Sequence, residues 1–399
     1  MSLHDLPATL HRLVPLRAEV DLEALRHNVR VLQGRAGAAE LIAAIKADAY
    51  GHGVIPITRV LVEEGVPRFA VANVPEGVEL REAGIEAPVH VLGAPLPEYL
   101  PAYARYDLIV TVSSGDVAEA VIEAATKVGP LTAHLKVDTG MHRLGIPPDE
   151  VPPVLARLQE TPGIEVEGLW THFATLGDAF TTEQLARFDA LVEQLDGIGR
   201  AGTHVTNTGT LFLVSGAVQG RAFVRAGGAL FGLVDDPAVA AEADDLKPVM
   251  RLVSRVVHLQ TVAAGETVSY GRTWTADQPT CIATVAAGYG DGLPRSLSNT
   301  GFVGIGGRLW PIAGRVCMDM LMLDLGSPEG PGASVQIGDE AVLFGPGGPS
   351  AAEVARQAGT ITYALTSGLT ARVPRLTIGE GSASAIPTPT GAKPDRVSV

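Results

Sequence analysis

The sequence predicts an α/β fold, a (β/α)8 barrel of the TIM type followed by a mainly β second domain. Three observations support this prediction. The chain of 399 residues is longer than one ordinary domain. Its first two thirds alternate short apolar segments with amphipathic ones. After residue 248 the pattern changes to short alternating runs separated by glycine-rich turns, which is typical of β structure.

Eight continuous apolar runs predict the barrel strands. Strands that helices cover on both faces are apolar throughout rather than alternating, which fits these runs. The segments between them, such as PITRVLVEEG and DVAEAVIEAATKVG, have apolar residues at helical spacing. A doubly wound sheet is the alternative, but no glycine-rich nucleotide-binding motif follows the first strand. The predicted strands are residues 41–46, 69–73, 89–93, 107–112, 132–138, 165–173, 203–207 and 229–233.

The predicted domain boundaries follow from these patterns. We expect an N-terminal segment over residues 1–16, the barrel over 17–246, the β domain over 247–380 and a disordered tail over 381–399. Serine, proline, threonine and glycine dominate the tail, and such a composition does not build a core. One helix is expected inside the β domain, in SAAEVARQAGT.

Composition limits the partners and the compartment. The formal net charge of −14 argues against a nucleic-acid partner. No apolar run of about 18 residues occurs, so no membrane span is expected. The N-terminus lacks the apolar core of a signal peptide, and the two cysteines, Cys281 and Cys317, fit a reducing compartment. Together these features predict a cytoplasmic enzyme.

Only five lysines occur, and two of them lie at predicted barrel strands. Lys46 ends the run LIAAIK, at the mouth of the barrel where catalytic side chains project. Burial there lowers the pKa of an amine, which suits imine chemistry with a carbonyl cofactor. The alternative is a lysine that caps the strand into solvent. Lys136 lies inside LKVD and needs either a charge partner, such as Asp138, or a modification that removes its charge; Arg143 follows at loop distance.

Two polar clusters follow later barrel segments. Arg225 precedes a pair of glycines, and an arginine beside open backbone amides can hold an anion. His204, Asn207 and Thr208 lie in THVTNTGT, where amides at a strand-to-helix turn can bind phosphate. Taken singly, each of these residues is also explained by a turn or a helix N-cap.

The β domain contains one candidate acid–base residue. Tyr289 lies in AAGYGDGLPR; a tyrosine in a glycine-rich turn is usually structural, but beside a cation it can act as an acid or a base. Cys317 and Met318 lie where a strand is expected to turn into a loop. The histidines show no metal-ligand spacing, so no metal site is expected.

Nine motifs stand along the chain in a specific order: AAIKADAYGHG, LKVDTGMHRLG, GLWTHFAT, HVTNTGT, VRAGGALFG, VSYGRTW, AAGYGDGLPR, GRVCMDM and ARVPR. They extend from about Arg17 to Leu376, nearly the whole chain. A strand-ending lysine before AYGHG, combined with GYGDG and CMD, is difficult to obtain by chance. In this combination the chain resembles the alanine racemases, a pyridoxal-phosphate family.

The resemblance implies a role for each motif. Lys46 would form the aldimine with pyridoxal 5'-phosphate and act as one proton-transfer base, and Tyr289 would be the opposite base, reaching the site of the partner subunit. Arg225 would meet the pyridine nitrogen and be oriented by His204. The other implied contacts are Arg143 at the phenolic oxygen with Lys136, carbamylated or not, beside it; Tyr50, Thr208, Gly227, Gly228 and Tyr363 at the phosphate; His172 and Asn207 beside the ring; and Met318 of the partner chain at the substrate carboxylate.

The chain departs from the family's usual motifs at two places. It has Thr206-Asn207-Thr208 where the family commonly has ANS, which retains a hydroxyl for the phosphate and adds a methyl group. It has Ala226 and Gly228 where the family commonly has a proline and a bulkier residue. Gly228 still offers its N–H, but the loop is less constrained.

The implied activity is interconversion of L-alanine and D-alanine by two-base racemization, which supplies D-alanine for peptidoglycan. A homodimer with shared active sites is implied with it. The alternatives are a racemase of broader specificity acting on serine or lysine, a pyridoxal-phosphate-dependent amino-acid decarboxylase, a cofactor-independent racemase using two cysteine thiols, and a non-catalytic pyridoxal-phosphate carrier. The usual motifs of the decarboxylases are not evident, and known carriers are lone barrels.

Overall fold

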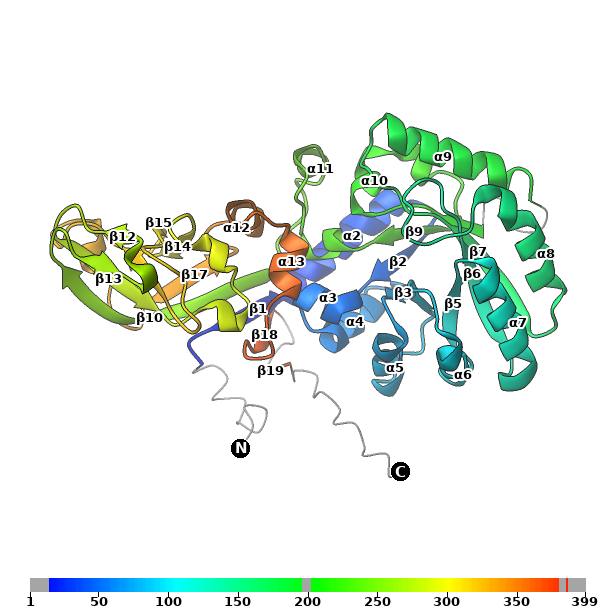
Figure 1. The fold of residues 1–399 in the computed structure, drawn as a ribbon, viewed down its shortest axis with the longest axis horizontal. Coiled ribbons are helices and arrows are strands. Elements are labelled where there is room, and N and C mark those ends of the chain that lie inside the picture. The colour runs from blue at the N-terminus through cyan, green and yellow to red at the C-terminus, as the bar shows by residue number, and fades with distance from the viewer. Residues whose placement is uncertain (1–13, 196–201, 380–384, 387–399) are drawn as a thin grey trace, which may run out of the picture. The chain divides into compact units, whose positions relative to one another are not determined.

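The structure is a computed structural model that describes residues 14–195, 202–379 and 385–386. The chain divides into two compact units (Figure 1). A barrel unit comprises Ala24–Tyr50 and Val54–Lys247, and a β unit comprises Met1–Glu23, Gly51–Gly53 and Pro248–Val399. Most of the expected N-terminal segment and tail lies outside the described residues.

The described part of the barrel unit contains one sheet of eight parallel strands in the order β8-β7-β6-β5-β4-β3-β2-β9. From β2 to β8 each strand pairs with the next along the chain, and β2 also pairs with the last strand, β9, so that β8 and β9 form the two edges of the sheet. The sheet is therefore a nearly closed barrel, which confirms the predicted fold class. The strands are β2 (Glu40–Ala44), β3 (Arg68–Val71), β4 (Val89–Val91), β5 (Leu108–Val112), β6 (Leu131–Lys136), β7 (Ile164–Trp170), β8 (Thr203–His204) and β9 (Phe223–Ala226).

The Thr206 side chain, two residues after the end of β8, links that segment to β9. The Thr206 hydroxyl accepts a hydrogen bond from the Arg225 N–H at 2.6 Å and donates one to the Arg225 carbonyl at 3.2 Å. Both atoms belong to the backbone of β9. The Thr206 side chain therefore makes hydrogen bonds that the backbone of a neighbouring strand would otherwise make at this edge of the sheet.

Helices surround the sheet of this unit (Figure 1). In α7 (Gly115–Val128) the Ser114 hydroxyl caps the first turn by accepting from the Val117 N–H, and the buried residues Ala118, Val121 and Ala125 share one face. The other helices are α2 (Leu22–Ala36), α4 (Val54–Glu63), α5 (Val74–Glu82), α6 (Leu100–Arg105), α8 (Val151–Glu160), α9 (Ala179–Val192), α10 (Thr208–Leu213) and α11 (Pro237–Glu242). Among the described residues, every helix is too short or too polar to cross a membrane.

The eighth barrel strand differs from the prediction. The sequence placed it at residues 229–233, whereas β9 is Phe223–Ala226 and the predicted segment forms the 3-10 helix η6 (Gly228–Phe231). Its residues Ala229, Leu230 and Phe231 are fully buried. A short apolar run is equally compatible with a buried strand and a buried helical turn, so periodicity alone could not separate the two.

The β unit is built on a sheet of nine strands among the described residues. Its core includes Leu252, Val285, Leu323 and Phe344. The helix expected in SAAEVARQAGT is α12 (Ala351–Ala358), capped by Ser350. The other elements are β10 (Met250–Val262), β13 (Thr280–Val285), β14 (Phe302–Ile305), β15 (Arg308–Pro311), β16 (Leu321–Asp324), β17 (Glu340–Phe344), β18 (Arg375–Ile378), β19 (Ala385–Ile386), α13 (Thr362–Ser367) and the separate pair β11 (Thr267–Val268) and β12 (Trp274–Thr275).

The strand β1 (Arg17–Asp21) also belongs to this sheet, whereas the predicted barrel range of 17–246 included it. It pairs antiparallel with β10, through Arg17 opposite Val253, and parallel with β18, through Ala18 opposite Arg375. Its partners lie more than 200 residues away in the sequence. The local pattern of a strand before helix α2 is the same as that of a barrel unit, so nothing local revealed the difference.

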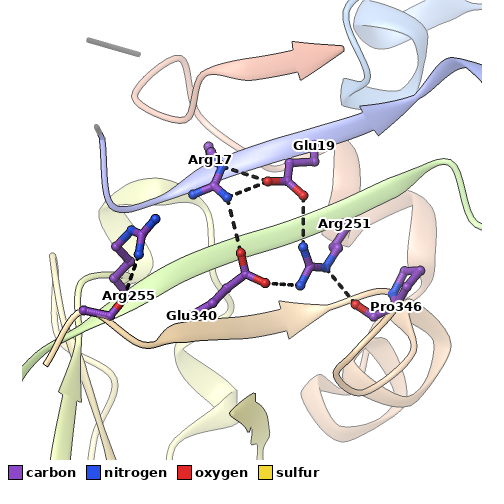
Figure 2. A network of polar contacts seen from close by, with 7 residues as sticks. Arg17, Glu19, Arg251, Arg255, Glu340 and Pro346 are labelled. Atoms are coloured by element: carbon purple, nitrogen blue, oxygen red, sulfur yellow. Dashed lines mark hydrogen bonds and ion pairs between the residues drawn. The ribbon is translucent and has the colours of Figure 1, made fainter. Parts of the chain in front are cut away.

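A closed ring of ion pairs ties β1, β10 and β17 together (Figure 2). Arg17 pairs with Glu19 at 2.6 Å and with Glu340 at 3.3 Å. Arg251 pairs with Glu19 at 3.0 Å and with Glu340, and its Nε donates to the Pro346 carbonyl at 2.7 Å. Because each charge contacts two opposite charges, the four side chains hold one another in place.

We expect Glu340→Gln to lower the free energy of unfolding by about 1 kcal/mol, because a half-buried network of ion pairs contributes more to stability than an isolated surface pair does. It leaves Arg17 and Arg251 to share the single carboxylate of Glu19. Urea unfolding at low and high salt measures the effect, which should shrink as salt screens the charges. Glu329→Gln, which removes an exposed charge outside the ring, is the control. Equal stability of the two variants would contradict the prediction.

Candidate active site

Lys46 stands at the mouth of the barrel, in a backbone turn of unusual hand. β2 ends at Ala44, and α3 (Lys46–Gly51) follows directly. The four residues from Ala47 to Tyr50 have φ angles of 52–55°, the left-handed region. For non-glycine residues this conformation costs roughly 1–2 kcal/mol per residue. The surrounding structure must therefore hold the turn in place.

Two carboxylates hold this left-handed turn. Glu76 of α5 accepts from the Ala47 N–H at 2.9 Å and from the Ala72 N–H at 2.6 Å. Asp48 accepts from the Val54 N–H at 2.7 Å. Glu76 was not among the predicted site residues, although its place three residues after the N-cap Asn73 is the sequence pattern of a capping box. Here its carboxylate also reaches the backbone that carries Lys46.

Two arginines and one carboxylate influence the charge of the Lys46 amine. Burial lowers its pKa, the charges of Arg143 and Arg225 lower it further, and Glu76 opposes the shift. A lower amine pKa at a strand end agrees with the sequence expectation and disagrees with a lysine that merely points into solvent. Lys46 thus has a larger share of the unprotonated, nucleophilic form at neutral pH than an ordinary lysine.

Arg225 is buried inside the barrel and its N–H groups are directed at specific acceptors. Nη1 lies 2.5 Å from Nδ1 of His204 and donates to the His204 carbonyl at 2.9 Å, while Nη2 donates to the Thr171 carbonyl at 2.8 Å. Burial lowers the pKa of Arg225 to about 9, which leaves the guanidinium charged at neutral pH. Both the ring and the carbonyl of His204 thus contact this guanidinium.

Lys136 lies beside an aromatic ring and not in the ion pair with Asp138 that was one of its two explanations. Its Nζ lies 4.2 Å from the centre of the Trp170 ring, and the structure shows no ion pair with Asp138 among the described residues. Asp138 instead accepts from the N–H groups of Gly140 and His142 and contacts the His142 ring. Burial, together with the charges of Arg225 and Arg143, lowers the pKa of Lys136 to about 7.

His172 and Asn207, two further residues of the predicted site, lie in different environments. The His172 ring feels the charges of Arg225, Lys136, Arg143 and Lys46, and burial and these charges hold its pKa well below the ordinary value. The Asn207 side chain accepts from the Thr210 N–H at 3.0 Å as the N-cap of α10. Asn207 is therefore a helix N-cap, which was the alternative explanation for this residue.

A glycine creates room beside a tyrosine hydroxyl. A Cβ added to Gly227 would lie 2.5 Å from the hydroxyl of Tyr50, so any larger residue there would clash with it. The Tyr50 ring packs against Phe231 at 5.5 Å between centroids. Nearby, the Thr208 hydroxyl accepts from the Ala229 N–H at 3.2 Å. These groups line η6, which Gly228 begins.

Tyr289, Met318 and Tyr363 lie in the β unit, where three of the sequence motifs converge. Gly288 and Gly290 approach the Met318 carbonyl so closely that a Cβ on either would lie within 3.0 Å of it. The Tyr289 N–H donates to the Cys317 carbonyl at 3.0 Å. The side chains of Tyr289 and Met318 remain exposed. The two motifs thus present both side chains from one rigid corner.

Arg372 of the motif ARVPR holds the same corner. It pairs with Asp319 at 2.6 Å and with Asp291 at 3.2 Å. Asp291 in turn accepts from the Gly288 N–H at 2.9 Å. One guanidinium therefore connects the GYGDG and CMD motifs, which the sequence alone could only name separately.

The fold and the site define a barrel enzyme with a desolvated lysine and a buried arginine at the mouth of the barrel. The model for the alanine racemase N-terminal domain matches residues 20–235, and the model for the alanine racemase C-terminal domain matches residues 249–377. The chain belongs to the alanine racemase family and is an isomerase.

Individual relatives agree with the family models over most of the chain. The alanine racemase of Halothermothrix orenii is 39% identical over 90% of this chain and 96% of its own length. The solved alanine racemase of Streptomyces coelicolor has a TM-score of 0.85 at 34% identity, covering 92% of this chain and 98% of its own. That of Clostridium difficile has a TM-score of 0.85 at 32% identity, covering 92% and 97%.

Glu76→Gln should lower the pKa of Lys46, because the carboxylate that stabilises the ammonium form is removed. Reductive methylation with ¹³C-formaldehyde labels the few lysines, and an NMR titration follows Lys46, assigned with Lys46→Arg. Glu82→Gln, on the exposed end of the same helix, is the control. A Lys46 pKa that is unchanged or raised in Glu76→Gln would contradict the assignment.

The free energy of unfolding should rise with pH between about pH 7 and pH 10 because of Lys136. Its folded pKa of about 7 lies below the unfolded value, so the unfolded chain binds the extra proton across this window. This stability is therefore complete above the unfolded pKa and is lost as the pH falls towards 7. Urea unfolding in bicarbonate-free buffer should show a weaker slope in Lys136→Met than in the exposed-site control Lys127→Met. Identical slopes in the two variants would exclude Lys136 as the cause of the pH dependence.

Proposed function

We propose that the chain interconverts L-alanine and D-alanine with pyridoxal 5'-phosphate held on Lys46. The observation that carries the proposal is the Lys46 amine, whose pKa is lowered by burial and by two guanidinium groups at the mouth of the barrel. An amine that loses its proton readily would be the nucleophile that holds a carbonyl cofactor at this position. Membership of the family supports alanine as the substrate.

The residues present fit a cofactor that carries a phosphate group. The bare backbone at Gly227 leaves space beside the Tyr50 hydroxyl that a Cβ would fill. The Thr208 hydroxyl and the amides of Gly227 and Gly228 supply further donors of the kind that bind phosphate. We infer that these four residues hold the phosphate, with Tyr363 as an additional contact that rests on the resemblance.

When bound, the cofactor supplies the electron sink that makes the Cα–H of an amino acid acidic. We infer that Arg225 would hold the pyridine nitrogen of the cofactor by donating a hydrogen bond to it, and that this nitrogen would then stay unprotonated, since a guanidinium gives up its proton with difficulty. A weaker sink suppresses side reactions such as transamination. Arg143 is assigned to the phenolic oxygen, with Lys136 beside it, and His172 and Asn207 to the neighbourhood of the ring.

Racemization needs a proton removed from one face of Cα and returned to the other. Lys46 is assigned to one face and Tyr289 to the other, and the backbone of Met318 to the substrate carboxylate. The exposure of Tyr289 and Met318 on the β unit supports their use by a second chain in a homodimer. We place the enzyme in the cytoplasm as a source of D-alanine for peptidoglycan.

A racemization assay with L-alanine, L-serine and L-lysine tests this function and its breadth. We expect conversion of L-alanine, with Lys46→Ala slower by orders of magnitude and without the visible absorbance of a cofactor imine. A yellow protein that racemizes none of the three amino acids would contradict the proposal. So would a Lys46→Ala variant that retains a borohydride-reducible lysine adduct.

Complementation between two variants tests the shared site. Lys46→Ala and Tyr289→Phe should each be poorly active alone, because each lacks one base. Co-expressed chains should form mixed dimers in which one of the two symmetric sites is complete, so activity should recover to about half of the wild-type rate per dimer. Proven mixed dimers without recovery would mean that both bases act within one chain, or that Tyr289 is not the second base.

A further inference from the structure

A continuous chain of polar side chains crosses the interior of the barrel. It starts at Arg225, whose Nη1 lies 2.5 Å from Nδ1 of His204. Nε2 of His204 lies 2.9 Å from Nδ1 of His134, and Nε2 of His134 lies 2.9 Å from Oε2 of Glu167. Arg68 completes the chain by donating to both oxygens of Glu167, at 3.0 Å to Oε2.

The chain joins the two ends of the barrel. Arg225 donates to the Thr171 carbonyl, just beyond the last residue of β7. Arg68 is the first residue of β3 and pairs at 3.0 Å with Glu40, the first residue of β2. In a parallel barrel the first residues of the strands mark the face opposite the catalytic mouth. Groups at that opposite face are thus connected to Arg225.

Histidines occupy interior positions that most barrels fill with branched apolar residues. His90 of β4, His134 of β6 and His204 of β8 come from alternate strands, and their ring centroids lie 4.6–5.7 Å apart. All three are buried, and a buried polar group without a partner is costly. Five of the six ring nitrogens have a partner, and within the described residues only Nδ1 of His90 does not.

Glu167 determines the direction of each hydrogen bond in this chain. Burial raises the pKa of Glu167, but hydrogen bonds from His134 and Arg68 outweigh it and lower the pKa to about 2, so the carboxylate only accepts. Burial lowers the pKa of His134, although Glu167 opposes this shift, and burial also lowers the pKa of His204. Each ring in its neutral form has one N–H. His134 therefore donates from Nε2 to Glu167 and accepts at Nδ1 from the Nε2–H of His204. His204 is left with an unprotonated Nδ1, to which Arg225 donates.

We propose that Glu167 is a positioning residue for Arg225, and that it acts through the tautomers of His134 and His204. It keeps the lone pair of His204 Nδ1 facing the guanidinium and so holds the guanidinium in one orientation. In the other tautomer, an N–H of His204 would face an N–H of Arg225, and two donors would repel. The consequence for turnover rests on the proposed function of Arg225, but the tautomers do not.

A metal ion shared by the three histidines is the competing explanation. Their ligand atoms lie within 4.8 Å of one another. The charges of Arg225 and Arg68, however, act on His90, on His134 and on His204, and disfavour a further cation there. Five of the six ring nitrogens are also already occupied by hydrogen bonds. The geometry therefore favours the hydrogen-bonded chain, and the test below separates the two.

The tautomers of the wild-type protein give the first test. Long-range ¹H–¹⁵N NMR of ¹⁵N-histidine-labelled protein, assigned with His134→Asn and His204→Asn, should show both rings neutral with the proton on Nε2. An Nδ1–H tautomer or a charged ring at either position would overturn the proposal. Stoichiometric zinc in the purified protein, measured by mass spectrometry, would also overturn it. This measurement needs no variant of Glu167 to fold.

Removal of the acceptor gives the second test. In Glu167→Leu the side-chain volume is nearly retained, but His134 loses the oxygen that fixes its tautomer, so His134 and His204 should each show a mixture of tautomers. Glu40→Gln is the matched control, because it removes the other carboxylate of Arg68 and leaves Glu167 in place. The control should keep the wild-type tautomers. A single Nε2–H tautomer in folded Glu167→Leu would overturn the proposal.

Activity separates this proposal from the proposed function. If both hold, racemization of L-alanine should fall about tenfold or more in Glu167→Leu, as expected for the loss of one charge-assisted hydrogen bond. It should stay near the wild-type rate in Glu40→Gln. Mixed tautomers with an unchanged rate would overturn the positioning role. A wild-type protein that racemizes nothing but shows both Nε2–H tautomers would count against the proposed function alone.

Discussion

The barrel depends on keeping one guanidinium buried and satisfied at the seam of its sheet. An isolated charge inside a protein is strongly unfavourable, so Arg225 requires acceptors at defined positions. The carbonyls of Thr171 and His204 and the His204 ring provide them. The Thr206 hydroxyl binds the backbone of the same residue. The contacts that link β8 to β9 therefore also orient the side chain of Arg225.

The mouth of the barrel stores strain in the turn that carries Lys46. Four consecutive left-handed residues would not persist in an isolated peptide, because each is unfavourable on its own. Glu76 and Asp48 compensate by accepting backbone N–H groups on either side of the turn. The same Glu76 carboxylate opposes the decrease in the pKa of Lys46. Backbone geometry and amine chemistry are thus coupled through one side chain.

In the β unit the glycines of GYGDG allow two backbone segments to lie close together. Gly288 and Gly290 lie against the Met318 carbonyl, where no Cβ fits, and Arg372 connects Asp291 with Asp319. These contacts fix the backbone that carries Tyr289 and Met318. A fixed backbone favours proton transfer by a side chain, because small displacements reduce the efficiency of the transfer. The ring formed by Arg17, Glu19, Arg251 and Glu340 similarly anchors β1, β10 and β17.

The sequence by itself determined the alternation of barrel strands and helices, the β character after residue 248, and the position of Lys46 at a strand end, because period and turn chemistry are local. Tertiary structure decided what depends on distant partners. It placed β1 in the β sheet, formed the eighth barrel strand at Phe223–Ala226, and made Asn207 a helix cap. It also brought Glu167 and His134 into contact with the Arg225 network. Hydrogen bonds between residues that lie far apart in the sequence leave no periodic trace in it.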